Sequence, residues 1–156
     1  MIMRRMLLSS AILLLVLAAP AAAQETEEAA VREVIQRLFD GMRSRDTAMI
    51  RSTFADQAQF YGLDREGAVR VDTPSAFITS IASAPEGLVL DEVLHDTEVR
   101  IDGPLAVVWT YYDFFAGENF SHCGYDAFQL LKVQGEWKIV ALADTRRREG
   151  CRQQRS

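Results

Sequence analysis

The apolar residues near the start of the chain recur at helical spacing. Over residues 25–45 they return every three or four positions, which predicts one long amphipathic helix. Acidic residues lie near its start and arginines near its end, the arrangement that a helix dipole favours. The residues expected on its buried face are Val31, Val34, Ile35, Leu38, Phe39 and Met42.

Two shorter helices are predicted next. Asp46 is a suitable N-cap for the first of them. Thr73 and Pro74 supply an N-cap and a proline at the first helical position of the second, which should end before Pro85. The expected buried residues are Met49, Ile50 and Phe54 for the first, and Phe77, Ile78 and Ile81 for the second.

Strands account for the rest of the pattern, because from Leu88 onward apolar and polar residues alternate. Asp102-Gly103 and Gln134-Gly135 are turn signals that predict two hairpins. On the first long strand we expect one face to carry Val93, His95, Thr97, Val99 and Ile101. The expected strands are 59–63, 68–71, 93–101, 105–115, 122–133 and 136–145. Helices followed by an antiparallel sheet indicate an α+β domain.

The first 23 residues have the order of features found in a secretory signal peptide. A pair of arginines precedes an apolar run over residues 6–19, and Pro20 interrupts that run before three alanines. We therefore expect cleavage before Gln24 and a secreted or periplasmic domain over residues 24–156. The apolar run is too short to span a bilayer. The alternative is an N-terminal anchor that is not cleaved.

The expected mature domain is acidic. The chain has 17 basic and 22 acidic residues, and removing Arg4 and Arg5 leaves 15 basic residues and a formal charge of −7. This charge disfavours nucleic acid or an anionic membrane as a partner. Five arginines between residues 146 and 155 form a local exception. We interpret them as a solvated tail, with an anion or partner site as the alternative.

The order of the predicted elements, together with Gly135-Glu136-Trp137-Lys138-Ile139 in the last hairpin, resembles the nuclear transport factor 2-like (NTF2-like) superfamily. SnoaL-like proteins and ketosteroid isomerase belong to this superfamily. The resemblance covers nearly all of residues 24–156 and implies a cone-shaped fold, in which helices pack on a strongly curved antiparallel sheet and enclose a pocket. It also implies dimerisation through the outer sheet face. These folds host enzymes and ligand carriers alike.

The residues of ketosteroid isomerase carry over only in part. By this resemblance its general-base aspartate would fall near Gly62 and its first tyrosine near Arg37, so neither group is evident. Asp126 lies near the place of the aspartic acid in its oxyanion hole. A pocket carboxyl that apolar neighbours keep neutral could donate a hydrogen bond, but one acid without a base is not a mechanism.

Strand parity places Asp126 on a face with Phe128, Leu130 and His122, which makes that face a candidate pocket wall. Asp144 is favoured on the same face. The parity of the last strand depends on the length of the hairpin loop. The residues that join this wall are therefore either Val140, Leu142 and Asp144 or Trp137, Ile139 and Ala141. Asp126 and Asp144 could instead be ordinary ion-paired sheet residues.

The aromatic residues of the strands could line the pocket or simply fill the core. Trp109, Tyr111 and Asp113 share one face of their strand and Thr110, Tyr112 and Phe114 share the other. One of these faces should line the pocket and the other an interface. Tyrosine hydroxyls on Tyr61, Tyr112 or Tyr125 could orient a polar ligand group. The candidate pocket residues are Tyr61, Trp109, Tyr112, Phe114, Asp126 and Phe128.

Several other chemistries have no basis in the sequence. His95 and His122 are the only histidines, and no spacing of histidines, cysteines or acids supports a metal site. The chain also lacks a phosphate loop, a dinucleotide fingerprint and a nucleophile elbow. We expect no metal and no cofactor.

Two functional hypotheses remain. The first is a pocket domain without catalysis that binds a small apolar or mixed-polarity molecule. The second is an isomerase, dehydratase or hydrolase in which Asp126 acts with Tyr61, His122 or Asp144. Two titratable groups within hydrogen-bonding reach in one cavity would favour the enzyme. The sequence identifies neither the ligand nor the oligomeric state.

Cys123 and Cys151 should form a disulfide. They are the only two cysteines, and the expected destination of the chain is oxidising. The last hairpin places Cys123 opposite about Arg146, a few residues before Cys151, and Gly150 gives the backbone freedom to return. Free thiols and a bridge between subunits are the alternatives.

Overall fold

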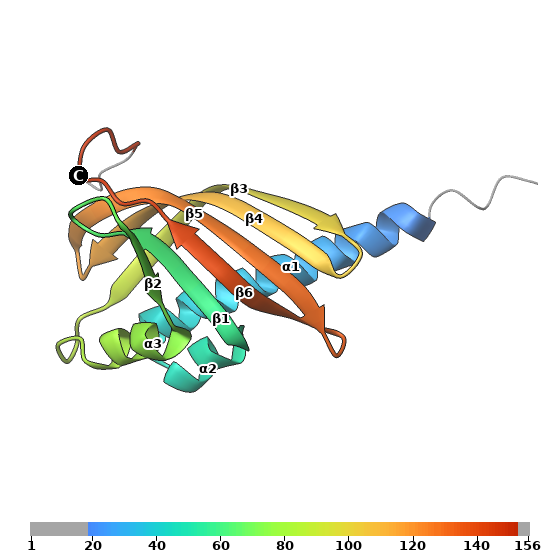
Figure 1. Cartoon of the computed structure of the whole chain (residues 1–156), viewed down its shortest axis with the longest axis horizontal. Helices are drawn as coiled ribbons and strands as arrows, with labels where there is room; N and C mark the ends of the chain where they lie inside the picture. The colour runs from blue at the N-terminus through green and yellow to red at the C-terminus, as the bar shows by residue number, and fades with distance from the viewer. Residues whose placement is uncertain (1–18, 153–156) are drawn as a thin grey trace, which may run out of the picture.

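Three helices pack against a six-stranded sheet in the computed structural model, which describes residues 19–152 (Figure 1). The order across the sheet is β2-β1-β6-β5-β4-β3. All neighbours are antiparallel except β1 and β6, which run parallel. The strands are β1 Phe54–Leu63, β2 Val69–Asp72, β3 Leu90–Asp102, β4 Leu105–Ala116, β5 Asn119–Val133 and β6 Glu136–Asp144. This confirms the predicted α+β fold.

Helix α1, Ala19–Ser44, is the long amphipathic helix predicted from the sequence. Most of the predicted signal peptide lies in residues 1–18, outside the described residues, and cleavage before Gln24 stays a prediction. Within residues 19–152, no helix is both long enough and apolar enough to cross a membrane. The buried stripe of α1 comprises Val31, Ile35, Leu38, Phe39 and Met42.

The two short helices begin at their predicted caps. Asp46 Oδ1 accepts hydrogen bonds from the backbone N–H groups of Ala48 and Met49 at 3.0 and 2.9 Å, which opens α2, Thr47–Ser52. Thr73 caps α3, Pro74–Ala82, with proline in its first turn. Phe54, expected on the second helix, instead begins β1.

Helix α2 ends at Ser52 because the backbone of the following residue, Thr53, is already hydrogen-bonded to the sheet. The N–H of Ile139 in β6 donates to the Thr53 carbonyl at 2.9 Å. This hydrogen bond draws the chain into the parallel pair of β1 and β6. Phe54 is still buried, as the sequence pattern indicated, but from a strand.

A β-bulge in β3 changes which residues face the helices. The register with β4 shifts between His95 and Glu98, where Asp96 has a φ of 51°. An extra residue in one strand reverses the alternation of its side chains. The expectation that Val93 and His95 share a face with Val99 is therefore wrong. The β3 residues that pack against the core are Leu90, Leu94, Val99 and Ile101.

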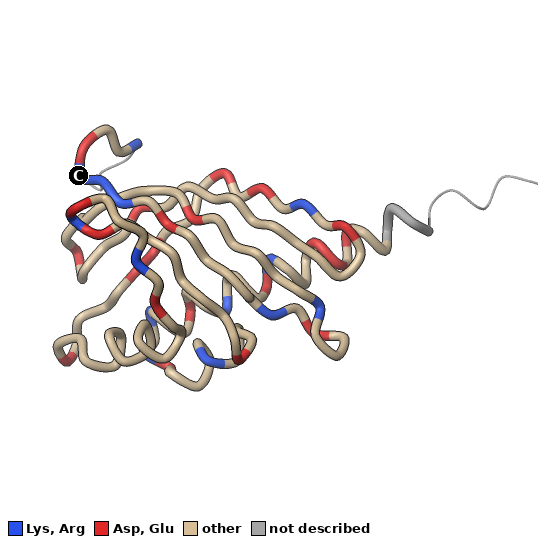
Figure 2. Tube along the Cα trace, viewed as in Figure 1, with Lys and Arg blue, Asp and Glu red and all other residues tan. Residues whose placement is uncertain are grey.

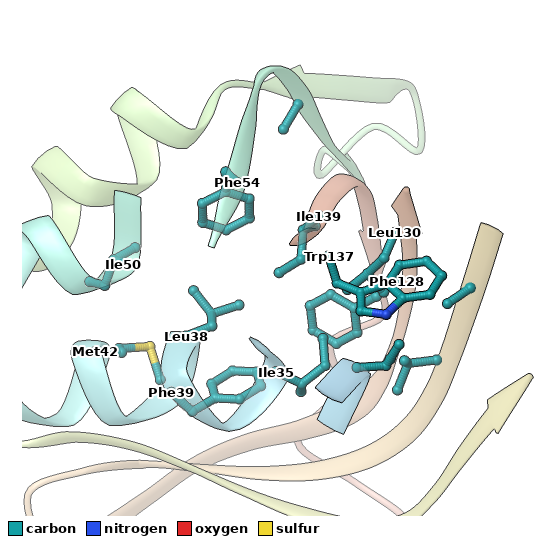
Figure 3. Close-up of a cluster of buried hydrophobic side chains, with 14 of the residues drawn as sticks. Ile35, Leu38, Phe39, Met42, Ile50, Phe54, Phe128, Leu130, Trp137 and Ile139 are labelled. Atoms are coloured by element: carbon teal, nitrogen blue, oxygen red, sulfur yellow. The ribbon is translucent and has the colours of Figure 1, made fainter. Parts of the chain in front are cut away.

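A second bulge, in β6, brings residues of both alternative sets to the core side of the sheet, Trp137 and Ile139 from one set and Leu142 from the other. The register with β5 shifts between Gln129 and Leu130, which pair with Ala141 and Ile139, so Val140 is the extra residue. Trp137 and Ile139 are buried in the first half of the strand, and beyond the bulge Leu142 packs against the same core. The core is shown in Figure 3, where side chains of α1 meet those of β5 and β6.

The structure contains the predicted disulfide between Cys123 and Cys151. Cys123 is fully buried, and it exchanges two backbone hydrogen bonds of 2.9 Å with Arg147, one residue from the predicted partner. The disulfide thus fixes the segment after β6, residues 145–152, which we call the C-terminal arm. At its end, the Arg152 guanidinium lies 4.5 Å from the ring centre of Tyr111.

Replacing Cys151 by Ser should destabilise the fold. The disulfide closes a loop of 28 residues, for which the chain-entropy estimate is roughly 3.5 kcal/mol, or about 10 °C in melting temperature. Urea unfolding of the oxidised wild type and the Cys151→Ser variant measures this difference. Reduced wild type is the control and should match the variant. An unchanged unfolding free energy would show that the arm contributes little to stability.

Candidate functional site

A cavity of about 350 Å³ lies between the helices and the sheet. Helices α1 and α3 contribute to its walls, together with residues from all six strands and the start of the C-terminal arm. Near the C-terminal end of the described chain, acidic and basic positions lie side by side (Figure 2). The polar residues around the cavity are Tyr61, Arg70, Asp72, Ser80, Glu92, Tyr112, Asp126, Asp144 and Arg146.

Two carboxyls meet in this cavity. Asp126 projects from β5 with only 3% of its surface exposed, and Glu92 reaches it from β3. Within residues 19–152, no N–H or O–H group donates a hydrogen bond to Asp126 Oδ2. The Glu92 and Asp126 carboxyls lie close enough to hydrogen-bond to each other, which requires a proton on one of them. The pair can therefore share a proton, as carboxylate dyads do.

The pKa values of both carboxyls are raised. Burial raises the pKa of Glu92 to about 7, although the hydrogen bond with Asp126 acts in the opposite direction. Burial also raises the pKa of Asp126 well above its usual value, and the negative charges of Glu92 and Asp144 add to the effect. Near neutral pH the pair can thus both donate and accept a proton, which an ordinary surface carboxylate cannot do.

Two ion pairs flank the carboxyl pair. Asp144 lies directly opposite Asp126 in the ladder of β5 and β6, on the face that the sequence favoured, and its Oδ2 is 2.6 Å from Nε of Arg146. Burial disfavours the charge of Arg146, but the hydrogen bond with Asp144 and the negative charges of Asp144 and Glu92 together raise the pKa of the guanidinium. On β2, Nε of Arg70 lies 3.1 Å from Asp72 Oδ2. Both arginines of the cavity are therefore already paired.

The opposite wall of the cavity is apolar. The rings of Phe60 and Phe77 are tilted against each other with centroids 5.3 Å apart. They are joined there by Leu38, Phe39 and Leu142. Apolar walls with a few convergent polar groups are the usual composition of a small-molecule site.

The tyrosine hydroxyls of the cavity are engaged with the protein itself. Tyr112 is buried and donates to the Thr145 carbonyl at 2.8 Å, and Tyr61 donates to the Gln59 side chain. Burial raises the pKa of Tyr112, and the neighbouring carboxyls raise it further. Tyr125, also considered from the sequence, hydrogen-bonds to Arg152 of the C-terminal arm and lies away from the cavity.

Three predicted pocket residues do not line the cavity. Trp109 lies on the outer sheet face, 48% exposed and stacked on Tyr125, because odd-numbered residues of β4 point away from the helices. Phe128 is buried in the core against Phe39. Phe114 stacks on His122 with ring centroids 4.8 Å apart. Trp109 thus lies on the sheet face opposite the cavity, and Phe114 and Phe128 lie on the cavity side of the sheet without lining the cavity.

His122 lies beyond Tyr112, whose ring it meets edge-on, and does not line the cavity. Burial and the positive charge of Arg146 lower the pKa of His122 to about 4. The imidazole is thus neutral at physiological pH. Of the three candidate catalytic residues, Asp126 and Asp144 line the cavity, and His122 does not.

The sequence analysis missed Glu92, Arg70 and Arg146. Glu92 could have been found, because it alternates with Leu90 and Leu94, which face the core. The two arginines carry no such signal, since one lies on a short edge strand and the other just past the last strand. Within residues 19–152, no three acidic, histidine or cysteine side chains are grouped as metal ligands would be.

A family model described as "Putative lumazine-binding" matches residues 26–143. Among solved structures, an NTF2-like protein of unknown function from Shewanella baltica is 22% identical, with a TM-score of 0.63 over 80% of this chain and 96% of that one. A protein of unknown function from Mycobacterium tuberculosis is 16% identical, with a TM-score of 0.70 over 84% and 78%. A "putative dehydratase" of the NTF2-like family from Streptomyces avermitilis is 14% identical, with a TM-score of 0.63 over 79% and 97%. No curated protein matches the chain.

The carboxyl pair should make stability fall as pH rises. Because the folded-state pKa of Glu92 lies above its ordinary value of 4.5, its contribution to the free energy of unfolding is fully present below pH 4.5 and is lost through pH 7. Asp126 acts in the same direction. His122, with a lowered pKa, acts oppositely below pH 6.5.

A comparison of wild type with Glu92→Gln separates these effects, because both proteins retain His122. The wild-type free energy of unfolding, relative to the variant, should fall by roughly 1–3 kcal/mol from pH 5 to pH 8 in urea titrations. Glu98→Gln, which removes an exposed carboxylate outside the cavity, should keep the wild-type pH profile. A difference that rises with pH would contradict the raised pKa.

Proposed function

The chain belongs to the family described as "Putative lumazine-binding", and on this premise we propose that it binds a small molecule of mixed polarity in the cavity between the helices and the sheet. Its NTF2-like structural neighbours confirm the resemblance drawn from the sequence. The observation that carries the proposal is Asp126, a buried carboxyl in a cavity with an apolar wall, whose Oδ2 receives no hydrogen bond from an N–H or O–H group of residues 19–152. Such an acceptor is costly unless a ligand or a proton satisfies it.

A second function, proton transfer on a bound substrate, is favoured by the carboxyl pair. The criterion set from the sequence for an enzyme was two titratable groups in hydrogen-bonding reach within one cavity, and Glu92 and Asp126 meet it. Asp126 would act with Glu92 rather than with Tyr61, His122 or Asp144. An isomerase or dehydratase needs a group that both gives and takes a proton near neutral pH. The S. avermitilis neighbour, described as a "putative dehydratase", fits this alternative.

We propose that the protein acts outside the cytoplasm, with residues 1–23 removed and residues 24–156 forming the mature domain. The disulfide between Cys123 and Cys151 is compatible with an oxidising compartment. The intact mass of the exported protein tests this proposal. It should equal that of a chain beginning at Gln24 with two hydrogens fewer, and a mass that includes the apolar N-terminus would overturn the proposed cleavage.

A ligand carried through purification should be visible in native mass spectra of protein from its own host, and the variant Ala76→Trp should lose it. Ala76 lies on α3 at the cavity wall, where an indole would fill the entrance. The matched control is Thr79→Trp, on the same helix but outside the cavity lining. A ligand retained by Ala76→Trp, or lost equally by both variants, would place the binding site elsewhere.

We also propose that a second copy packs on the outer sheet face. Five large apolar side chains are 40–48% exposed along that face of β4 and β5. They are Leu105, Val107, Trp109, Leu131 and Val133. An exposed apolar patch of this kind marks an interaction surface.

The oligomeric state should therefore depend on Trp109. Light scattering should give a dimer for the wild type and a monomer for Trp109→Glu, because the charge would be buried in the interface. Ser75→Glu on α3, an exposed position on the helix side of the sheet, adds the same charge away from this face and should leave the dimer intact. A wild-type monomer at high micromolar concentration would contradict the interface.

A further inference from the structure

The charges around the cavity are arranged by depth. Arg70 and Arg146 are exposed, with 54% and 63% of their side chains accessible, and each already forms an ion pair with an aspartate. Asp126 is almost fully buried, and Glu92 beside it is partly buried. The positive groups thus lie at the outside, and the most buried of the acidic and basic groups is the carboxyl of Asp126.

The buried acid has an acceptor that only a proton or a ligand can satisfy. Within residues 19–152, Asp126 Oδ2 receives no hydrogen bond from any N–H or O–H group, although Asp126 lines the cavity. The hydroxyl of Tyr112, which lines the same cavity, donates to the Thr145 carbonyl instead. The Glu92 carboxyl can act as a partner only while it shares a proton with Asp126.

The balance of charge indicates what kind of ligand donor fits. Four carboxyls line the cavity against two guanidiniums, and Asp72 and Asp144 already neutralise the two arginines. The Glu92 and Asp126 pair therefore carries one uncompensated negative charge when it holds one proton. A ligand anion placed there would be repelled, whereas a cation would supply the charge partner that a buried carboxylate needs.

The apolar wall accommodates the rest of such a ligand. Phe39, Phe60 and Phe77 line the same cavity as the carboxyl pair. Aromatic faces also attract an ammonium group through their ring quadrupole. The site thus combines a buried anionic end with an aromatic wall.

We propose that the ligand of this cavity is an organic amine cation, whose ammonium group hydrogen-bonds to Asp126 and Glu92 and whose apolar body packs on the phenylalanines. This inference rests on the proposed function of small-molecule binding and adds the chemical class of the ligand. The ammonium group takes the place of the shared proton, so binding releases that proton to the solvent.

Three probes of nearly equal shape test the charge. Phenethylamine is a cation, phenylacetamide is a neutral N–H donor and phenylacetate is an anion. Chemical-shift titrations of the wild type at pH 7.5 measure the three affinities. Phenethylamine should bind at least about ten times more tightly than either of the other probes, because one charge-assisted hydrogen bond contributes about this factor. The shifts should include residues of β3 and β5 that flank the cavity.

The pH dependence tests the exchange of ammonium for proton. Phenethylamine stays protonated throughout, as a lysine side chain does. Its affinity should rise about tenfold from pH 5.5 to pH 7.5, because at lower pH it must displace a proton from the pair. The other charged groups that line the cavity with the pair are Asp72, Asp144, Arg70 and Arg146, and His122, whose pKa is lowered to about 4, is neutral over this range. An affinity that falls with pH would overturn the proposal.

Two variants locate the ammonium group. Asp126→Asn should weaken phenethylamine binding at least about tenfold, and Glu92→Gln, which keeps the proposal testable if the first variant does not fold, should do the same. Glu98→Gln, which removes an exposed carboxylate outside the cavity, should stay within about twofold of wild type. Equal weakening by all three variants would mean that the charge of the whole surface, and not this pair, attracts the amine.

The outcomes separate this inference from the proposed function. If phenylacetamide or phenylacetate binds in the cavity as tightly as phenethylamine, the amine proposal fails and small-molecule binding stands. If none of the three probes shifts any cavity resonance, the amine proposal fails as well. The native mass spectra of the host protein then decide on small-molecule binding independently.

Discussion

The positions of Glu92 and Asp144 in the cavity depend on strand parity, which β-bulges in β3 and β6 reset. In β3 the bulge at Asp96 lets Glu92 face the cavity at one end while Val99 faces the core at the other. In β6 the bulge at Val140 lets Asp144 face the cavity while Ile139 faces the core. Without the extra residue, one half of each strand would turn its apolar side chains to solvent. Each bulge thus allows a single sheet face to carry both the core and the polar end of the cavity.

Because the apolar core and the polar end of the cavity occupy different parts of one sheet face, the carboxyls of Glu92 and Asp126 can be buried. The core of α1, β5 and β6 supplies the apolar burial that stabilises the fold, as Figure 3 shows for Phe39, Phe128 and Ile139. The cavity end can then hold groups that burial disfavours, such as Asp126. A shared proton lowers the cost of that burial, and the ion pair of Asp144 with Arg146 limits the negative charge beside it. Functional sites commonly retain such unfavourable groups.

The sequence predicted the elements well and the cavity only in part. The helix caps at Asp46 and Thr73 were found because their hydrogen bonds are local. The disulfide was predicted because two cysteines leave one intrachain pairing. Trp109 was misplaced because alternation shows that two faces exist without showing which one the helices cover. Arg70 and Arg146 were missed because they reach the cavity from an edge strand and from the arm, where no periodicity constrains a side chain.

The place of β6 in the sheet has a consequence for how the chain reaches this structure. Among the strands of residues 19–152 it is the last along the chain, yet it lies between β1 and β5 and is the one that joins the hairpin of β1 and β2 to the rest of the sheet. The first two strands therefore cannot join the sheet until β6 has been synthesised. Such non-local pairing slows folding. Until β6 has been made, the edge of β1 lacks the strand that covers it in the folded sheet.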